Sequence, residues 1–139
     1  MITHYRDVFV VNTNGHKKAT ANLANNTANW IEAALFNFLV AGEDTQGKYA
    51  LVEAVQRQGY EPAPQTYPDT DVTFYIMEGE MTFSVDGQTI AAPAGSNVFI
   101  NRGRAYSFAV KTETANTLIL FSPAISQDVY KKLNAAAKK

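Results

Sequence analysis

The sequence predicts an all-β domain of antiparallel strands, with a short C-terminal helix and an irregular N-terminal arm. Short runs of β-branched and aromatic residues recur along the chain from its middle onward. Glycine-containing turns separate these runs at short, regular intervals. A chain of 139 residues with 46% hydrophobic and 12% aromatic residues has enough apolar volume for one packed core. We therefore expect a single domain over residues 1–139.

Composition and charge exclude several classes of function. The formal net charge of -1 lacks the basic surplus that binding to a phosphate backbone requires, so we expect no nucleic-acid partner. The sequence has no cysteine, which excludes disulfides, thiolate metal sites and cysteine nucleophiles. Residues 1–7 do not resemble a secretion signal, and no apolar run is long enough to span a membrane. We expect a soluble, cytoplasmic protein with no membrane partner.

The first part of the chain contains an arm and then two strands. Residues 12–29 are rich in Asn, Thr and Ala without a clear apolar period, which predicts an irregular arm over about residues 1–34. The apolar runs at residues 30–40 and 49–55 indicate two strands joined by a turn. Residues 31–39 alone also fit a helix, and the pattern leaves this alternative open.

The centre of the chain predicts a series of hairpins. Asp86-Gly87 between two β-prone runs is a strong hairpin signal, because both central residues of a type I′ turn need a positive φ. Further turns are expected at residues 93–95 and at Arg102-Gly103. The strands expected here are residues 73–77, 81–85, 88–90, 98–100, 106–110 and 117–121.

The chain ends in a pattern that predicts a short amphipathic helix over about residues 126–137. Ser126 is a favourable N-cap, and Asp128 suits the first turn of a helix. Val129 and Leu133 are four residues apart and would share one apolar face. Several lysines follow, and they suit the C-terminal end.

Two sets of residues in the middle of the chain resemble the two motifs of the cupin superfamily. Where the first motif has Gly, His, His, Glu and Gly, this sequence has Gly59, Gln65, Tyr67, Val72 and Gly79. Where the second motif has Gly, Pro, Gly, His and Asn, it has Gly95, Asn101, Gly103, Tyr106 and Val110. Residues 42–45, 73–80 and 93–96 also resemble the quercetin dioxygenase-related branch, and the likeness spans roughly residues 35–133.

The resemblance implies a double-stranded β-helix, or jelly-roll, barrel over about residues 35–122. It also implies a site for iron, manganese, nickel, copper or zinc, but Gln65, Tyr67, Val72 and Tyr106 stand where the family has its ligands. Valine cannot ligate, a carboxamide ligates weakly, and a tyrosine must first lose a proton whose pKa is about 10. We therefore expect a metal to bind weakly or not at all, and we expect no cofactor.

Replacement ligands from elsewhere in the chain are not expected. His4 and His16 are the histidines of the sequence, and both fall in the N-terminal arm, where a lone histidine is usually solvated. Asp69 lies beside a proline in an expected turn. Strand alternation points Asp71 outward. A solvated acidic loop is the simplest interpretation of both aspartates.

Strand alternation predicts a largely apolar barrel interior. If Val72 faces inward, Phe74 and Ile76 follow it, and Phe108 follows Tyr106. Three polar ends would converge there. The expected ligand-binding residues are therefore Gln65, Tyr67, Val72, Phe74, Ile76, Tyr106 and Phe108. The alternative is that the polar groups bond one another and the aromatic groups are plain core.

Two arginines lie near the expected mouth of the barrel. Arg102 and Arg104 could attract an anionic ligand there, although solvated turn residues are the commoner case.

These patterns leave several functions open. The leading hypothesis is a metal-independent cupin that binds a small apolar or aromatic molecule in the barrel. The second is a metal-free isomerase, cyclase or lyase with Tyr67 or Tyr106 as general acid and Gln65 polarising a carbonyl, although no base is evident. The third is a quercetinase-like dioxygenase with an atypical metal site. Exposed strand edges also lead us to expect a homodimer.

Overall fold

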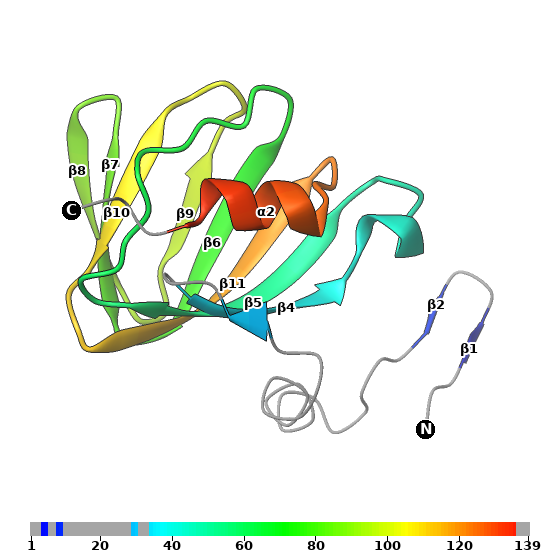
Figure 1. Cartoon of the computed structure of the whole chain (residues 1–139), viewed down its shortest axis with the longest axis horizontal. Helices are drawn as coiled ribbons and strands as arrows, with labels where there is room; N and C mark the ends of the chain where they lie inside the picture. Colours follow the sequence, from blue (N-terminus) through cyan, green and yellow to red (C-terminus); the bar gives the residue numbers. More distant parts are fainter. Residues whose placement is uncertain (1–3, 6–7, 10–28, 31–33, 136–139) are drawn as a thin grey trace.

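The computed structural model of this chain describes residues 4–5, 8–9, 29–30 and 34–135. Within these ranges the chain forms antiparallel strands and ends in an α-helix, as the sequence predicts (Figure 1). In chain order the elements are β1 (His4–Tyr5), β2 (Val8–Phe9), β3 (Asn29–Trp30), β4 (Ala34–Val40), the 3₁₀ helix η1 (Gly42–Asp44), β5 (Ala50–Arg57), β6 (Asp71–Glu78), β7 (Glu80–Val85), β8 (Gln88–Pro93), β9 (Asn97–Ile100), β10 (Tyr106–Val110), β11 (Thr114–Ser122) and α2 (Gln127–Leu133).

The strands are arranged as the two sheets of a jelly roll. A 6-stranded sheet has the order β3-β4-β5-β11-β6-β9, and a 3-stranded sheet has the order β10-β7-β8. Strand β6 belongs to the first sheet and β7 to the second, so the chain crosses from one sheet to the other at Gly79. The predicted all-β fold with a short C-terminal helix is therefore confirmed.

The predicted hairpin at Asp86-Gly87 is present. Both residues have a positive φ, 52° and 81°, and Val85 pairs with Gln88 across the turn. This two-residue connection fixes the register between β7 and β8. Alternation along β7 then sends Met81 and Phe83 into the core.

Aromatic rings fill the space between the two sheets. Phe74 of β6 is 2% exposed, and its ring centroid lies 4.9 Å from that of Phe83 and 5.8 Å from that of Phe108. The ring centroid of Tyr106 of β10 lies 5.9 Å from that of Phe74. Tilted and edge-on aromatic pairs at such distances add to the stability that area burial provides.

The structure resolves the ambiguity in the first half of the chain. Residues 34–40 form strand β4 rather than a helix, because Phe36 and Phe38 pair with Ala54 and Val52 of β5. Strand β8 continues past its expected end to Pro93, and strand β11 begins before its expected start, at Thr114. The expected irregular arm lies largely outside the described residues. No helix in the described ranges is long and apolar enough to cross a membrane.

The C-terminal helix is shorter than predicted and buries a different face. It spans Gln127–Leu133, and Ser126 is its N-cap as expected, accepting a hydrogen bond from the Val129 amide at 3.1 Å. Val129 is 41% exposed, whereas Tyr130 is 1% exposed. The expected place of Val129 on the buried face is therefore wrong, whereas Leu133 packs against the core as expected. Tyr130 packs on Phe36 and Phe121 instead, with centroids 4.8 Å and 6.0 Å away, so α2 covers the inner face of the 6-stranded sheet (Figure 1).

Candidate functional site

The main chain brings the first two predicted site segments together. Gln65 and Tyr106 form an isolated antiparallel bridge in which each amide donates to the other residue's carbonyl, at 2.8 Å and 2.9 Å. Two residues further on, the Tyr67 carbonyl accepts a hydrogen bond from the Gly103 amide at 2.8 Å. Because extended chain repeats its side-chain direction every second residue, Gln65 and Tyr67 point to the same side.

The side chains of Gln65, Tyr67 and Tyr106 meet in the barrel interior. Both hydroxyls donate to Gln65 Oε1, Tyr106 at 3.0 Å and Tyr67 at 3.4 Å. All three residues are buried, with exposed fractions of 2–4%. The sequence therefore identified a real cluster, and its polar groups bond one another as the alternative interpretation expected. We call these three residues the polar cluster.

Asn134, which the sequence interpretation missed, completes this cluster from the C-terminal side. Gln65 Nε2 donates to Asn134 Oδ1 at 2.9 Å, and Asn134 Nδ2 lies 3.4 Å from the Tyr67 hydroxyl oxygen. Asn134 is the C-cap of α2 and is 3% exposed. Its position four residues after Tyr130 was the available signal, because residues four apart share a helix face.

Burial holds the tyrosines of the site in their neutral form. It raises the pKa of Tyr67 from 10.0 to about 12, although the hydrogen bond with Asn134 opposes this shift. It also raises the pKa of Tyr106 well above its usual value, and the negative charge of an ionised Tyr67 would raise it further. The phenols are therefore hydrogen-bonding groups at neutral pH, and ionising either of them is unfavourable.

The predicted apolar residues are buried in the same interior as the polar cluster. Val72, Phe74 and Ile76 of β6 are each at most 2% exposed, and Phe108 of β10 is 6% exposed. Phe74 packs against Tyr106 as described above. Phe121 of β11 adds an aromatic wall, with its ring centroid 5.4 Å from that of Tyr67. Every residue of the predicted site therefore faces the interior.

A second pair of buried polar groups lies where α2 meets strand β5. Gln56 and Tyr130 are each 1% exposed, and neither Gln56 Nε2 nor the Tyr130 hydroxyl makes a well-formed hydrogen bond. Burial raises the pKa of Tyr130, and a weak hydrogen-bonding contact with the Gln56 side chain opposes this rise. Unpaired buried polar atoms are rare in folded proteins because leaving them without partners costs free energy.

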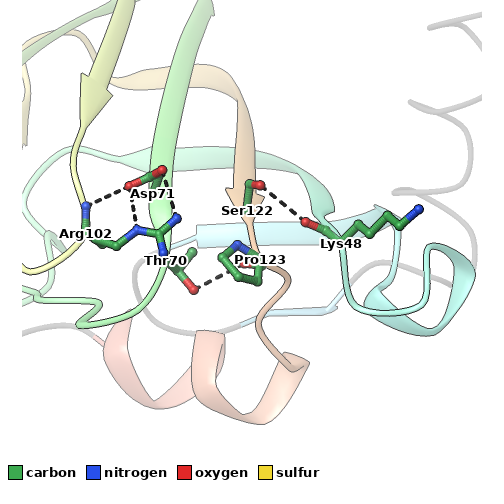
Figure 2. A network of polar contacts seen from close by, with 6 residues as sticks. All are labelled: Lys48, Thr70, Asp71, Arg102, Ser122 and Pro123. Atoms are coloured by element: carbon green, nitrogen blue, oxygen red, sulfur yellow. Dashed lines mark hydrogen bonds and ion pairs between the residues drawn. The ribbon is translucent and has the colours of Figure 1, made fainter.

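The two arginines near the barrel mouth are paired with aspartates. Figure 2 shows Arg102 against Asp71, to which its main-chain amide and two of its guanidinium nitrogens donate at 2.9–3.2 Å. These hydrogen bonds lower the pKa of Asp71. Arg104 forms an ion pair with Asp86. Asp71 points outward as predicted, but it is bonded to Arg102 rather than simply solvated.

A sequence model of the cupin domain matches residues 51–122. This range is more than half of the 139 residues and contains Gln65, Tyr67, Val72 and Tyr106. The chain belongs to the cupin family. A search of curated proteins found no match to this cupin.

Solved structures share the fold of this cupin at low sequence identity. Ectoine synthase from P. lautus aligns with a TM-score of 0.67 and 17% identity over 81% of this chain and 84% of that one. KdgF from Halomonas sp. aligns with a TM-score of 0.65 and 13% identity over 73% of this chain and 92% of that one. The Clostridium difficile EutQ protein aligns with a TM-score of 0.63 and 16% identity over 89% of this chain and 94% of that one. At such identities these likenesses show a shared fold alone.

The four residues that motif spacing sets at the expected ligand positions do not fit a first-row metal. Gln65 Oε1 already accepts hydrogen bonds from two phenols, and Gln65 Nε2 is a donor. Both phenols resist ionisation, and Val72 has no donor atom. No group of three His, Asp or Glu side chains that could hold a metal occurs within the described ranges. His16 lies outside these ranges, so its predicted solvation stays a prediction.

Proposed function

We propose that this cupin binds a small, neutral, largely aromatic or apolar molecule in its barrel, at the polar cluster. The observation that carries the proposal is the convergence of the Gln65 carboxamide and two phenolic hydroxyls within an aromatic interior. Apolar walls with a few convergent hydrogen-bonding groups are the usual construction of small-molecule sites. The polar cluster can both donate and accept hydrogen bonds, so it suits an uncharged polar group on the ligand.

The electrostatics of the interior favour a neutral ligand. Among the buried residues that the structure describes, Glu53 carries the only ionisable acid or base besides the tyrosines. It alternates with Val52 and Ala54, which are core residues, so its carboxylate lies on the opposite face of β5. The high pKa of Tyr67 reflects the same cost of placing negative charge here. Arg102 and Arg104 are exposed and already paired, so they support an anionic ligand poorly.

Binding is better supported than metal-free catalysis. A tyrosine whose pKa is about 12 is a weak proton donor near neutral pH. A general base must also lie within hydrogen-bond reach of the substrate, and the described part of the interior offers no imidazole or carboxylate. An isomerase, cyclase or lyase reaction through Tyr67 or Tyr106 is therefore the weaker candidate.

A quercetinase-like dioxygenase is the least supported of the three functions. Oxygen chemistry of that kind needs a redox cofactor or metal. The Gln65, Tyr67 and Tyr106 side chains offer one weak neutral donor and two phenols that resist ionisation. The likeness of residues 73–80 to that branch thus supports a related barrel better than a related reaction.

A thermal-shift titration with neutral aromatic metabolites, including flavonoids, tests the proposal. A compound present at 100 times its dissociation constant adds about 2.7 kcal/mol to the free energy of unfolding, which should raise Tm by several degrees. Tyr106→Phe should reduce this shift, whereas the control Tyr49→Phe, at a tyrosine 39% exposed, should leave it unchanged. A panel in which no compound raises Tm would contradict the proposal.

A further inference from the structure

The end of α2 closes a ring of hydrogen bonds over the polar cluster. Gln65 Nε2 donates to Asn134 Oδ1, Asn134 Nδ2 donates to the Tyr67 oxygen, and the Tyr67 hydroxyl donates to Gln65 Oε1. Asn134 Nδ2 also donates to the Tyr130 carbonyl at 3.0 Å, which ties the ring to α2. The Asn134 carboxamide thus occupies the position where a ligand's polar group would contact Gln65 and Tyr67.

Tyr130 places an aromatic ring in the same interior, on the helix that carries that carboxamide. It is one helical turn before Asn134 and lies among Phe36, Phe38 and Phe121, with centroid distances of 4.8–6.0 Å. The Tyr130 ring and the Asn134 amide together fill the α2 side of the barrel interior. Their chemistry is that of one small molecule, an aromatic ring next to an uncharged amide.

We propose that Tyr130 and Asn134 act as an internal substitute for the ligand, and that the ligand is a small neutral aromatic amide or lactam that displaces them. This inference rests on the proposed function and names the ligand class of the same site. In the ligand-free protein α2 covers the barrel. In the complex the ligand amide takes the place of the Asn134 carboxamide, and its ring takes the place of the Tyr130 ring.

The hydrogen-bonding pattern selects an amide over related groups. Once Asn134 leaves, Gln65 Nε2 needs an acceptor, and the Tyr67 oxygen can accept from a donor beside it. An amide supplies both on adjacent atoms. A carboxylate supplies no donor and would bring an unpaired charge into the interior. A hydrocarbon would leave the Gln65 donor unsatisfied.

The unpaired atoms at Gln56 and Tyr130 give the ligand an advantage over the internal substitute. Gln56 Nε2 is a buried donor that makes no well-formed hydrogen bond while Tyr130 is in place, and its contact with Tyr130 is weak. A ligand ring that carries an acceptor at the end remote from its amide would pair with this donor. Displacing Tyr130 also removes the second unpaired atom, its hydroxyl, from the buried interior.

The helix is short enough to move as a unit. It has seven residues, and helices of this length are not stable without tertiary contacts. A surface pocket of about 270 Å³ lies where α2 begins, between Phe38 and residues 124–127. Within α2 only Tyr130 is buried, so displacing this element breaks the contacts of one core side chain and leaves both sheets paired.

The test compares benzamide, benzoate and toluene, which share a ring but differ in polar group, by calorimetric titration of the full chain. We expect benzamide to bind at least about tenfold more tightly than either other probe, since a lost hydrogen bond to a buried group costs about this factor. Asn134→Ala removes the competing amide and should tighten benzamide binding. The control Val129→Ala, at an exposed residue of α2, should leave the affinity unchanged.

Hydrogen exchange on the wild-type protein supplies a second measurement that needs no variant. Saturating benzamide should speed amide exchange in residues 127–134 while slowing it in β6 and β10. Benzamide binding no tighter than toluene or benzoate, weaker binding by Asn134→Ala, or an α2 protected further by benzamide would each overturn the inference. If toluene binds and benzamide does not, the inference fails while the proposed function stands. If no probe and no panel compound binds, the proposed function fails as well.

Discussion

Gln65 is the residue on which the polar cluster depends most. Its carboxamide accepts from both phenols and donates to Asn134, so every other member contacts it. Gln65→Leu keeps the side-chain size but leaves several buried polar groups without a partner, at about 1–3 kcal/mol for each. We expect denaturant unfolding to show a loss of about 2–5 kcal/mol.

The exposed Gln88 of β8 offers the matched control for this change. Gln88→Leu should alter the free energy of unfolding by no more than about 0.5 kcal/mol. Equal effects at the two positions would mean that the hydrogen bonds of Gln65 contribute little to stability.

Tyr67 should make stability depend on pH in alkaline solution. Its pKa is raised from 10.0 to about 12 in the folded chain, so the unfolded chain loses this proton first. The stabilisation is complete below pH 10 and is lost as the pH rises from there toward 12, by up to about 3 kcal/mol.

Unfolding free energies of wild type and Tyr67→Phe across this alkaline range measure the effect. The wild type should lose stability more steeply than the variant, which lacks the ionisable group. Parallel curves for the two proteins would show that burial does not shift the Tyr67 pKa as described.

At the scale of the elements, Gly79 sets the crossing from β6 in one sheet to β7 in the other. It has a φ of 85°, and a Cβ there would lie 2.5 Å from the Thr114 carbonyl oxygen and 2.9 Å from Ala115 Cα. Both the backbone conformation and the space thus exclude a side chain. We expect Gly79→Ala to lower the free energy of unfolding by about 3 kcal/mol or more.

Gly47 separates the two causes of that loss. Its φ is 82°, but a Cβ there would meet no atom within 4 Å. Gly47→Ala should therefore cost only the strain of a positive φ, about 1–2 kcal/mol. If thermal unfolding shows equal losses for the two substitutions, the close approach of β11 to Gly79 is not important.

Local patterns made the strands predictable, whereas the buried face of the helix depends on long-range contacts and was difficult to predict. The Asp86-Gly87 turn and period-two alternation are properties of neighbouring residues, so they correctly placed β6, β7 and β10. Which face of α2 is buried depends on Phe36 and Phe121, which are distant in sequence. The Val129–Leu133 spacing could not supply that information.

The polar cluster was predictable for a related reason. Motif spacing together with alternation placed Gln65, Tyr67 and Tyr106 on one inner surface, and the structure brings them into hydrogen-bond contact. Asn134 could not be found this way, because it lies outside both motifs and reaches the cluster through the fold of α2. Gln56 could have been predicted from strand alternation, because it follows Val52 and Ala54 on the buried face of β5.

At the scale of the whole molecule, an exposed apolar patch on the outer face of the 6-stranded sheet favours a homodimer. Tyr75, Phe99 and Leu120 are 39%, 59% and 37% exposed, and Thr73 pairs with both Phe99 and Leu120. The four residues of this patch are uncharged, so a second copy of the same surface matches them in polarity. Sheets pack face to face in this way at about 10 Å.

Sedimentation velocity at several concentrations tests the dimer. We expect Phe99→Lys to shift the protein toward monomer, because it places a charge in the contact. Ile90→Lys, at an apolar residue 37% exposed on the other sheet, is the matched control and should remain dimeric. A wild-type protein that sediments as a monomer at all concentrations would contradict this expectation.

The measurement that tests the central claim most directly is the elemental metal content of the untagged protein. It should be made before and after adding stoichiometric iron, manganese, nickel, copper or zinc and desalting. If Gln65, Tyr67 and Tyr106 form a hydrogen-bonding site for a neutral molecule, each metal should stay below about a tenth of an equivalent. Close to one equivalent of any metal would show that these residues, or others joined to them, form a metal centre, and would contradict the account.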